Sequence, residues 1–160
     1  MPELNQTIAS AFCDRYSQNA KRVHELAEPL TNAQFWQKPF PYGNSFGHLV
    51  LHLTGNLNYY IGAQIARTGY VRDRPSEFTD PDPLPKAEVL KRLDEAIAMV
   101  LRTIGLQSPA EWSTEYSASG TDAKNRLDMV MICAAHMQLH IGQMIYLGYE
   151  LRSQAGTGSR

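Results

Sequence analysis

A long, proline-rich stretch in the middle of the chain does most to limit the fold. Residues 68–85 contain Pro75, Pro81, Pro83 and Pro85 among alternating charges, so we expect no helix or strand there. Antiparallel neighbouring helices need only a few linking residues. A connection of this length can instead run the length of a bundle and return the chain parallel to its earlier course. Helical patterns lie on both sides of the stretch, which therefore decides how the helices are directed.

Four stretches show the apolar spacing of helices, and no stretch alternates convincingly as a strand does. We expect these helices to span about 2–28, from a cap at Asn44 or Ser45 to about 67, 86–104, and from a cap at Thr121 or Asp122 to about 151. The segments between them are expected to be irregular. Prolines at 39 and 41 exclude a helix around them, and residues 106–121 are polar.

These elements predict an all-α protein, a four-helix bundle with an up-down-down-up sense and its long connection between the second and third helices. We expect residues 1–151 to form one domain and residues 152–160 to form a flexible C-terminal tail, because the tail has nothing to bury. Gly55 lies inside the second predicted helix, where a glycine costs ~1 kcal/mol relative to alanine. A close helix contact is the expected reason for it.

Composition excludes several classes of partner. The formal net charge is -1 and no basic stripe is present, so neither nucleic acid nor an anionic membrane is expected to bind. No uninterrupted apolar run is long enough for a transmembrane helix, and the N-terminus lacks the pattern of a signal peptide. Cys13 and Cys133 give no disulfide framework. We therefore expect a cytoplasmic protein.

Two pairs of histidines carry the strongest chemical signal in the sequence. His136 and His140 stand four residues apart in one predicted helix, and His48 and His52 stand four apart in another. Residues i and i+4 share a helix face, so two imidazoles in this arrangement can reach one divalent ion. For a lone histidine, a hydrogen-bonded core residue would be the better interpretation. For two pairs on apolar helices, we favour a metal site.

Either histidine of the second helix could supply a third ligand. His52 lies further into that helix and is the better candidate, whereas His48 is nearer the helix start and suits a solvent-facing or ligand-orienting role. Three histidines leave a coordination position open, which is the pattern of catalytic zinc sites. Imidazole also suits nickel, iron or copper, so the residues do not fix the metal.

Other side chains are weighed as partners of the ligands. Asn56, Gln143 and Tyr146 lie within a turn or two of a histidine and are candidates to orient it. Cys133 is better interpreted as a small core residue, and His24 as a surface or interface residue. For Glu77, a place in a solvated charged loop is the simplest interpretation, although it could also cover the mouth of the bundle. His48, Cys133 and Glu77 are also the side chains that could close the metal shell, which would argue against catalysis.

The two histidine segments resemble those of the DinB family, a group related to bacillithiol S-transferases and mycothiol-dependent maleylpyruvate isomerase. The first is NSFGHLVLHL at residues 44–53, in which the family's ligand falls seven positions after the serine, at His52. The second is HMQLHIGQ at residues 136–143, similar to the family's closing HxxxH-x-GQ element. The loop RDRPSEF at residues 72–78 is similar to one in a subgroup. The resemblance extends from the first helix to about residue 151.

This resemblance implies a four-helix bundle that holds one divalent metal ion on His52, His136 and His140. Zinc or nickel is the expected ion, with iron or manganese as alternatives, and a homodimer is the expected assembly. The implied activity is that of a thiol S-transferase, in which the metal activates a low-molecular-weight thiol for attack on a small electrophile. The alternatives are a metal-dependent hydrolase and a non-catalytic, metal-binding or stress-related interaction bundle. His48 departs from the residue common at its position, so a four-histidine site stays open.

Overall fold

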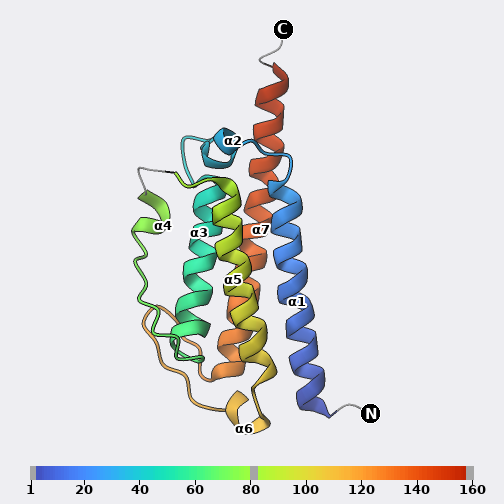
Figure 1. Ribbon diagram of the computed structural model, residues 1–160, viewed down its shortest axis with the longest axis vertical. Helices are drawn as coiled ribbons and strands as arrows, with labels where there is room; N and C mark the ends of the chain where they lie inside the picture. The colour runs from blue at the N-terminus through green and yellow to red at the C-terminus, as the bar shows by residue number, and fades with distance from the viewer. Residues whose placement is uncertain (1–2, 80–82, 158–160) are drawn as a thin grey trace.

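Four long helices lie side by side and form the body of the molecule (Figure 1). The computed structural model describes residues 3–79 and 83–157. The long helices are α1 (Leu4–Ala27), α3 (Phe46–Leu57), α5 (Lys86–Gly105) and α7 (Arg126–Thr157). No strand occurs within the described ranges, where an isolated bridge joins Glu115 and Asn125. The prediction of an all-α protein is therefore confirmed.

The packing of the long helices makes neighbours of the two that carry histidine pairs. Both α1 and α3 pack against α5 and against α7. In Figure 1, α1 and α7 rise while α3 and α5 descend, and the chain between α3 and α5 climbs back along the outside of the molecule. The described parts of the proline-rich stretch, residues 68–79 and 83–85, belong to this climb. Because α3 and α7 are in contact, their histidines lie within reach of one another.

Apolar side chains at helical spacing fill the space between the helices. On α5 the apolar residues at helical spacing are all buried, namely Val89, Leu93, Ala96, Ile97, Val100 and Ile104. On α7 the fully buried side chains include Met137 and Met144. Burying one such large side chain stabilises the fold by ~1.5–3 kcal/mol. The buried Tyr16 hydroxyl of α1 donates a hydrogen bond of 2.7 Å to the carbonyl oxygen of Val130, which ties α1 to α7.

Three short helices occupy segments that we expected to be irregular, namely α2 (Asn32–Trp36), α4 (Ser76–Thr79) and α6 (Pro109–Trp112). The expectation was wrong in these places for a local reason. Thr31 and Gln34 form a capping box at the start of α2, and Ser108 and Glu111 form another at the start of α6. Reciprocal side-chain bonds of this kind satisfy backbone N–H groups that would otherwise lack partners, so even one turn of helix is stable.

The second predicted helix is not a uniform α-helix. Its α-helical part ends at Leu57, and the chain continues as a π-helical segment, η1 (Asn58–Ala63). Arg67 and Gly69 then adopt positive φ values of 58° and 77°, so the helical course has ended by about the predicted residue 67. Such π-helical insertions are rare and often occur at functional sites. Here η1 follows directly after α3, the helix that carries His48 and His52.

Helix α7 differs from the prediction at both ends. It begins at Arg126, after Asn125, whose side-chain oxygen accepts a hydrogen bond of 2.9 Å from the backbone of Asp128. It continues to Thr157, beyond the predicted helix end at about residue 151 and into the segment expected to be a tail, and residues 158–160 lie outside the described ranges. The extension is held because Leu151 is buried and Gln154 bonds to Gln37.

By length and composition alone, α7 is the one described helix that could cross a membrane. Its apolar window within Arg126–Gly156 has a mean hydropathy of 1.2. We expected no such helix from the sequence, because polar residues interrupt every apolar run. A helix at the core of a soluble protein meets the same criterion. In this structure α7 contributes Met129, Met137 and Met144 to the core between the helices.

Candidate metal centre

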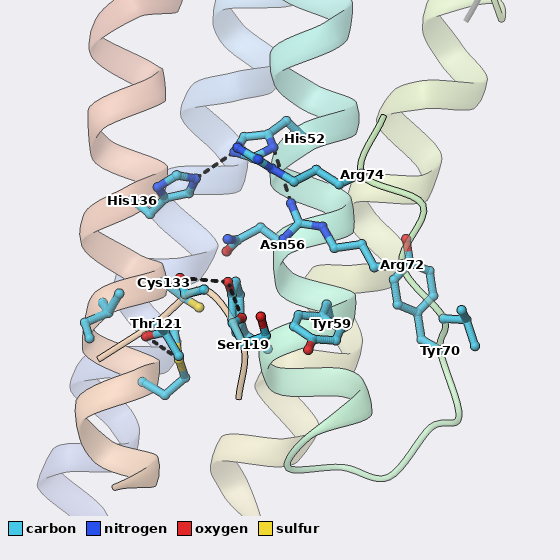
Figure 2. Close-up of a pocket in the computed structure, with 15 residues that line it drawn as sticks. His52, Asn56, Tyr59, Tyr70, Arg72, Arg74, Ser119, Thr121, Cys133 and His136 are labelled. Carbon is cyan, nitrogen blue, oxygen red and sulfur yellow. Dashed lines mark hydrogen bonds between the residues drawn. The ribbon is translucent and has the colours of Figure 1, made fainter. Parts of the chain in front are cut away.

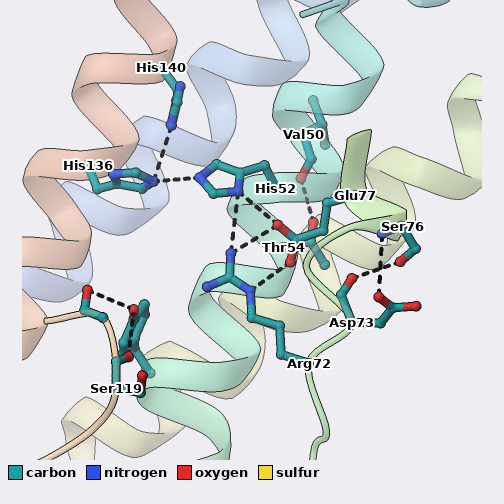
Figure 3. Close-up of polar contacts among 12 residues, drawn as sticks. Val50, His52, Thr54, Arg72, Asp73, Ser76, Glu77, Ser119, His136 and His140 are labelled. Carbon is teal, nitrogen blue, oxygen red and sulfur yellow. Dashed lines mark hydrogen bonds and ion pairs between the residues drawn. The ribbon is translucent and has the colours of Figure 1, made fainter. Parts of the chain in front are cut away.

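Three of the four paired histidines meet between α3 and α7. His52 Nε2 lies 3.0 Å from His136 Nε2, and His140 Nε2 lies 3.1 Å from the same atom (Figure 3). The donor nitrogens of all three lie within 4.8 Å of one another. The contact between α3 and α7 brings His52 close to the other two histidines. The i,i+4 spacing places His136 and His140 on the same face of α7. The structure thus brings together the three histidines that the sequence singled out.

Hydrogen bonds on the far side of two rings fix which nitrogen carries the proton. His52 Nδ1 lies 2.8 Å from Glu77 Oε2 and 3.3 Å from Arg72 Nη2; the carboxylate contact is the shorter of the two, and a carboxylate only accepts, so Nδ1 is the donor. His140 Nδ1 likewise donates to Gln143 Oε1 at 2.7 Å. In a neutral imidazole the other nitrogen then presents a lone pair. The Nε2 atoms of His52 and His140 therefore both offer lone pairs toward His136.

This arrangement fits a divalent cation. A proton on His136 Nε2 can satisfy only one of its two close neighbours, whereas a shared cation satisfies all three lone pairs. Tetrahedral zinc with Zn–N distances of about 2.0–2.1 Å places its ligand nitrogens about 3.3 Å apart. The observed separations of 3.0 and 3.1 Å are close to that value. The cluster can bind a metal ion, and three ligands leave one tetrahedral position open.

Burial keeps the imidazoles neutral, as metal ligands must be. Desolvation, followed by the nearby His140 and His52, lowers the pKa of His136 from its ordinary value to about 4. Burial also lowers the pKa of His140, although its hydrogen bond to Gln143 opposes the shift. Both rings are therefore unprotonated at neutral pH and offer lone pairs without first losing a proton.

The partner of His52 is a buried ion pair. Glu77 is only 5% exposed and accepts hydrogen bonds from Arg72 Nε at 2.7 Å and Arg72 Nη2 at 3.0 Å, besides the one from His52 (Figure 3). Burial raises the pKa of Glu77, but the bonds from His52 and Arg72 outweigh it and hold the pKa below its ordinary value. Glu77 is thus a carboxylate that orients His52, as partners of metal-bound histidines commonly do.

Gly55 makes room for this carboxylate. A Cβ atom at position 55 would lie 2.8 Å from Glu77 Cδ, a distance that real Cβ contacts do not show. A side chain there would push Glu77 away from His52. The expected close helix contact at Gly55 is therefore present, and the neighbouring helix is α4, which carries Glu77.

A pocket of about 760 Å³ opens beside the cluster (Figure 2). His52 and His136 form part of its wall, and the α7 residues Met129, Ile132 and Cys133 form an apolar side. The remaining described lining residues come from α3, η1 and two loops, namely Asn56, Tyr59, Tyr60, Tyr70, Val71, Arg72, Arg74, Ser119, Gly120 and Thr121. The open side of the cluster thus faces a space large enough for a small molecule.

The sequence profile of the DinB superfamily matches residues 15–144. This chain belongs to the DinB superfamily. The matched range runs from α1 through the HxxxH pair of α7, so it includes all three clustered histidines. The resemblance that the two histidine segments suggested is confirmed at the level of the family.

A solved structure shares the DinB fold of this chain. The crystal structure of a conserved protein from Enterococcus faecalis superposes with a TM-score of 0.73, covering 96% of this chain and 99% of that one. The two sequences are 15% identical, so the likeness shows the fold alone. No curated protein matches the chain in sequence.

In this DinB protein His48 does not join the cluster, so among described residues the group contains three histidines rather than four. His48 is buried, not solvent-facing as one expectation had it. Its Nδ1 lies 2.7 Å from Ser45 Oγ, and its ring packs edge-on against Trp36. Ser45 also caps α3 by accepting from the His48 backbone. The first turn of the helix uses this side chain for its own packing.

The remaining candidates have separate outcomes. Gln143 bonds to His140 as an orienting residue would, whereas Tyr146 is 75% exposed and does not. Asn56 lines the pocket rather than bonding to a clustered ring. Burial raises the pKa of Cys133 to about 12, which agrees with a core thiol that stays protonated. His24 bonds to Asp94 on the surface.

Sequence reasoning missed the role of Glu77. The loop looked solvated because charges alternate along it, yet Glu77 is buried and Arg72 is nearly so. Two signals were available. Glu77 stands five positions after Arg72 in the loop. Gly55 interrupts the otherwise apolar second helix. Neither signal alone indicates that Glu77 lies against His52.

Proposed function

We propose that this protein is a divalent-metal-dependent enzyme whose metal ligands are His52, His136 and His140. The observation that carries the proposal is the convergence of three histidine side chains, two of which, His52 and His136, line a pocket. Structural zinc sites are closed by four protein ligands, whereas catalytic sites keep a position open. Zinc or nickel is the expected ion, and iron or manganese the alternative; imidazole ligands suit zinc, nickel and iron.

The reaction that we propose is thiol S-transfer. A divalent cation in the cluster would lower the pKa of a thiol in the pocket and so favour its thiolate. The sulfur then forms a bond to an electrophilic carbon of the second substrate. The leaving group departs with the electron pair of the broken bond, and the thiol proton passes to solvent. No oxidant or reductant is needed.

The chain's own residues prepare this chemistry. Glu77 and Gln143 hold the rings of His52 and His140 with their lone pairs inward. Arg72 keeps Glu77 ionised and in place through two hydrogen bonds. The apolar wall formed by Met129 and Ile132 limits water beside the open position. Preorganised ligands of this kind bind metal without paying to reorder their side chains.

A panel of low-molecular-weight thiols with a chromogenic electrophile tests the proposal. Protein loaded with zinc or nickel should accelerate thioether formation with at least one thiol, and removal of the metal by a chelator should abolish the acceleration. The variant His136→Ala should lose it, whereas His24→Gln, which removes a surface histidine, should keep it. The absence of any metal-dependent rate across the panel would contradict S-transfer.

The alternatives use the same cluster differently. A hydrolase would use the open position to activate water, and it would cleave ester or amide reporters in the absence of thiol. A non-catalytic metal-binding or stress-related interaction bundle would bind metal and show neither activity. We favour the enzyme because a pocket of about 760 Å³ adjoins the open side of the cluster.

We also infer the arrangement of the whole chain. The packing of α1 and α3 against both α5 and α7, with the directions seen in Figure 1, supports an up-down-down-up four-helix bundle formed as one domain by residues 1–151. The absence of a disulfide between Cys13 and Cys133 agrees with a cytoplasmic location. No membrane or nucleic-acid partner is proposed.

A homodimer is part of the proposal. Four large apolar side chains project from one face of α7 into solvent, at Met131, Leu139, Tyr146 and Tyr149. Their spacing places them on the face opposite the buried methionines. Light scattering of the wild type and of Tyr146→Asp tests this point, since a dimer through α7 should dissociate in the variant. A wild type that is monomeric at all concentrations would contradict it.

A further inference from the structure

The pocket beside the cluster carries an unbalanced positive charge. Two arginines line it, and none of its described lining residues is an aspartate or glutamate. The charge of Arg72 is matched by Glu77, which approaches within 2.7 Å. Arg74 makes no ion pair with any residue that the structure describes, and Figure 2 shows its side chain extending from the loop to the level of His52. One cation therefore faces the pocket without a partner acid among the residues that the structure describes.

The Arg74 side chain lies at the pocket wall near the cluster. Figure 2 shows it beside His52, and it lines the same space as His136 of α7 and Tyr60 of η1. A negatively charged ligand in this pocket is therefore close enough to be attracted by the Arg74 guanidinium.

A second, independent feature lies in the same wall. Asn56 is 7% exposed, and its buried Oδ1 atom has no hydrogen-bond partner among the described residues. An unsatisfied buried amide oxygen is costly and usually signals a missing partner. Asn56 also lines the pocket, one turn of α3 below His52 (Figure 2). A polar group of a ligand can supply the partner that the chain lacks.

We propose that this pocket selects small ligands that carry a carboxylate, which Arg74 binds while a second group of the same molecule points at the three imidazoles. In ligands that carry a hydroxyl or N–H group between these two ends, that group donates to the unpaired Oδ1 of Asn56. The apolar side formed by Met129 and Ile132 suits a short aliphatic body. Guanidinium and carboxylate match in charge and geometry, which makes arginine the usual residue for this task. The inference rests on the proposed function and names the class of molecule that it uses.

Two thiols of equal length test the inference by binding alone. Protein loaded with about one equivalent of Co²⁺ is titrated with 3-mercaptopropionate and with 3-mercaptopropionamide, and the thiolate-to-cobalt absorption reports occupancy. The wild type should bind the acid about tenfold more tightly than the amide, the lower end of what a charged hydrogen bond contributes at a solvent-facing group. Salt should reduce this preference.

The variant Arg74→Gln should bind both thiols equally, with its affinity for the amide unchanged. Because the same two thiols meet both proteins, differences between their own thiol pKa values cancel. The matched control is Arg102→Gln on the exposed face of α5, away from the pocket, and it should keep the full preference. Arg74→Lys should keep part of it, since charge remains and the forked geometry is lost.

The outcomes separate this inference from the function on which it rests. Equal binding of acid and amide by the wild type would overturn the carboxylate site and leave thiol binding intact. A preference that survives in Arg74→Gln would overturn the role of Arg74. Cobalt-loaded protein that binds neither thiol would overturn both the thiol function and this inference. Arg74 is exposed, so its substitution should not affect folding.

Discussion

The two histidine pairs share a spacing but differ in where they stand on their helices. His136 and His140 lie in the middle of α7, and both rings face the cluster. On α3 only His52 faces it, while His48 lies in the first turn beside Ser45 and Trp36. The i,i+4 spacing places two rings on one face in both helices. Whether both rings can reach one ion also depends on the contacts that each ring already makes. At the start of α3, His48 is held by Ser45 and by Trp36 of α2.

The largest expected difference is in zinc affinity, between the variants His52→Ala and His48→Ala. Loss of a ligand should weaken zinc binding by more than about 100-fold, beyond the usual effect of losing an orienting partner. His48→Ala should leave zinc affinity nearly unchanged but lower the free energy of unfolding by about 1–3 kcal/mol, because a hydrogen bond and an aromatic contact are lost. Chelator competition and urea unfolding measure the two quantities. Equal loss of affinity in both variants would make His48 a ligand.

A smaller effect is expected from Glu77→Gln. The variant removes the carboxylate that orients His52, so zinc affinity should fall about 10–100-fold. It also leaves the buried Arg72 charge without its partner, which should lower the free energy of unfolding by about 3 kcal/mol. The matched control is Glu95→Gln at the exposed Lys91 pair, with an expected change below about 1 kcal/mol. Zinc affinity equal to that of the wild type would show that Glu77 supports only the loop.

The pH dependence of the metal-free protein compares a clustered histidine with a surface one. Burial and the neighbouring rings lower the pKa of His136 to about 4, below the ordinary value of about 6.5. Between these two values the unfolded chain binds more protons, so stability should fall as pH falls from about 6.5 toward 4 and be fully present above that range. Urea unfolding in a chelator should show a shallower fall for His136→Ala. His24→Gln should follow the wild type, and the reverse result would contradict the assignment.

The smallest effects are expected at two helical glycines. Gly55→Ala should displace Glu77 and weaken zinc binding about tenfold, as loss of an orienting partner does. Gly142→Ala meets no atom within 4 Å, so it should raise the free energy of unfolding by ~0.5–1 kcal/mol and leave zinc binding alone. Calorimetry and zinc titration on both variants check the contrast. A stabilising Gly55→Ala with normal zinc affinity would remove the need for a small residue there.

Much of the fold was accessible from the sequence because it depends on repeated local patterns. The buried stripe of α5 follows the 3.6-residue period, and the proline-rich stretch lies where the structure returns the chain along the outside. The incorrect predictions concern the ends of helices and the short helices between them. Capping boxes produced α2 and α6. Burial of Leu151 and the bond between Gln37 and Gln154 accompany the extension of α7 beyond the predicted end. Such contacts depend on residues far apart in the chain.

The candidate site was accessible only in part for the same reason. Spacing within one helix identifies His136 and His140, and position within α3 favours His52 over His48. The roles of Glu77 and Arg72 depend on how a loop folds back against α3, which no local pattern encodes. The charge at Arg74 has meaning only once the pocket and its lack of described acidic residues are seen.

The most direct test of the account is the metal content of protein prepared without a histidine tag, for the wild type and His136→Ala side by side. The account predicts about one equivalent of a divalent ion in the wild type, after reconstitution with zinc or nickel if needed, and almost none in the variant. Circular dichroism should show that the variant is folded. A wild type that holds no metal under these conditions would contradict the account and make the three histidines structural.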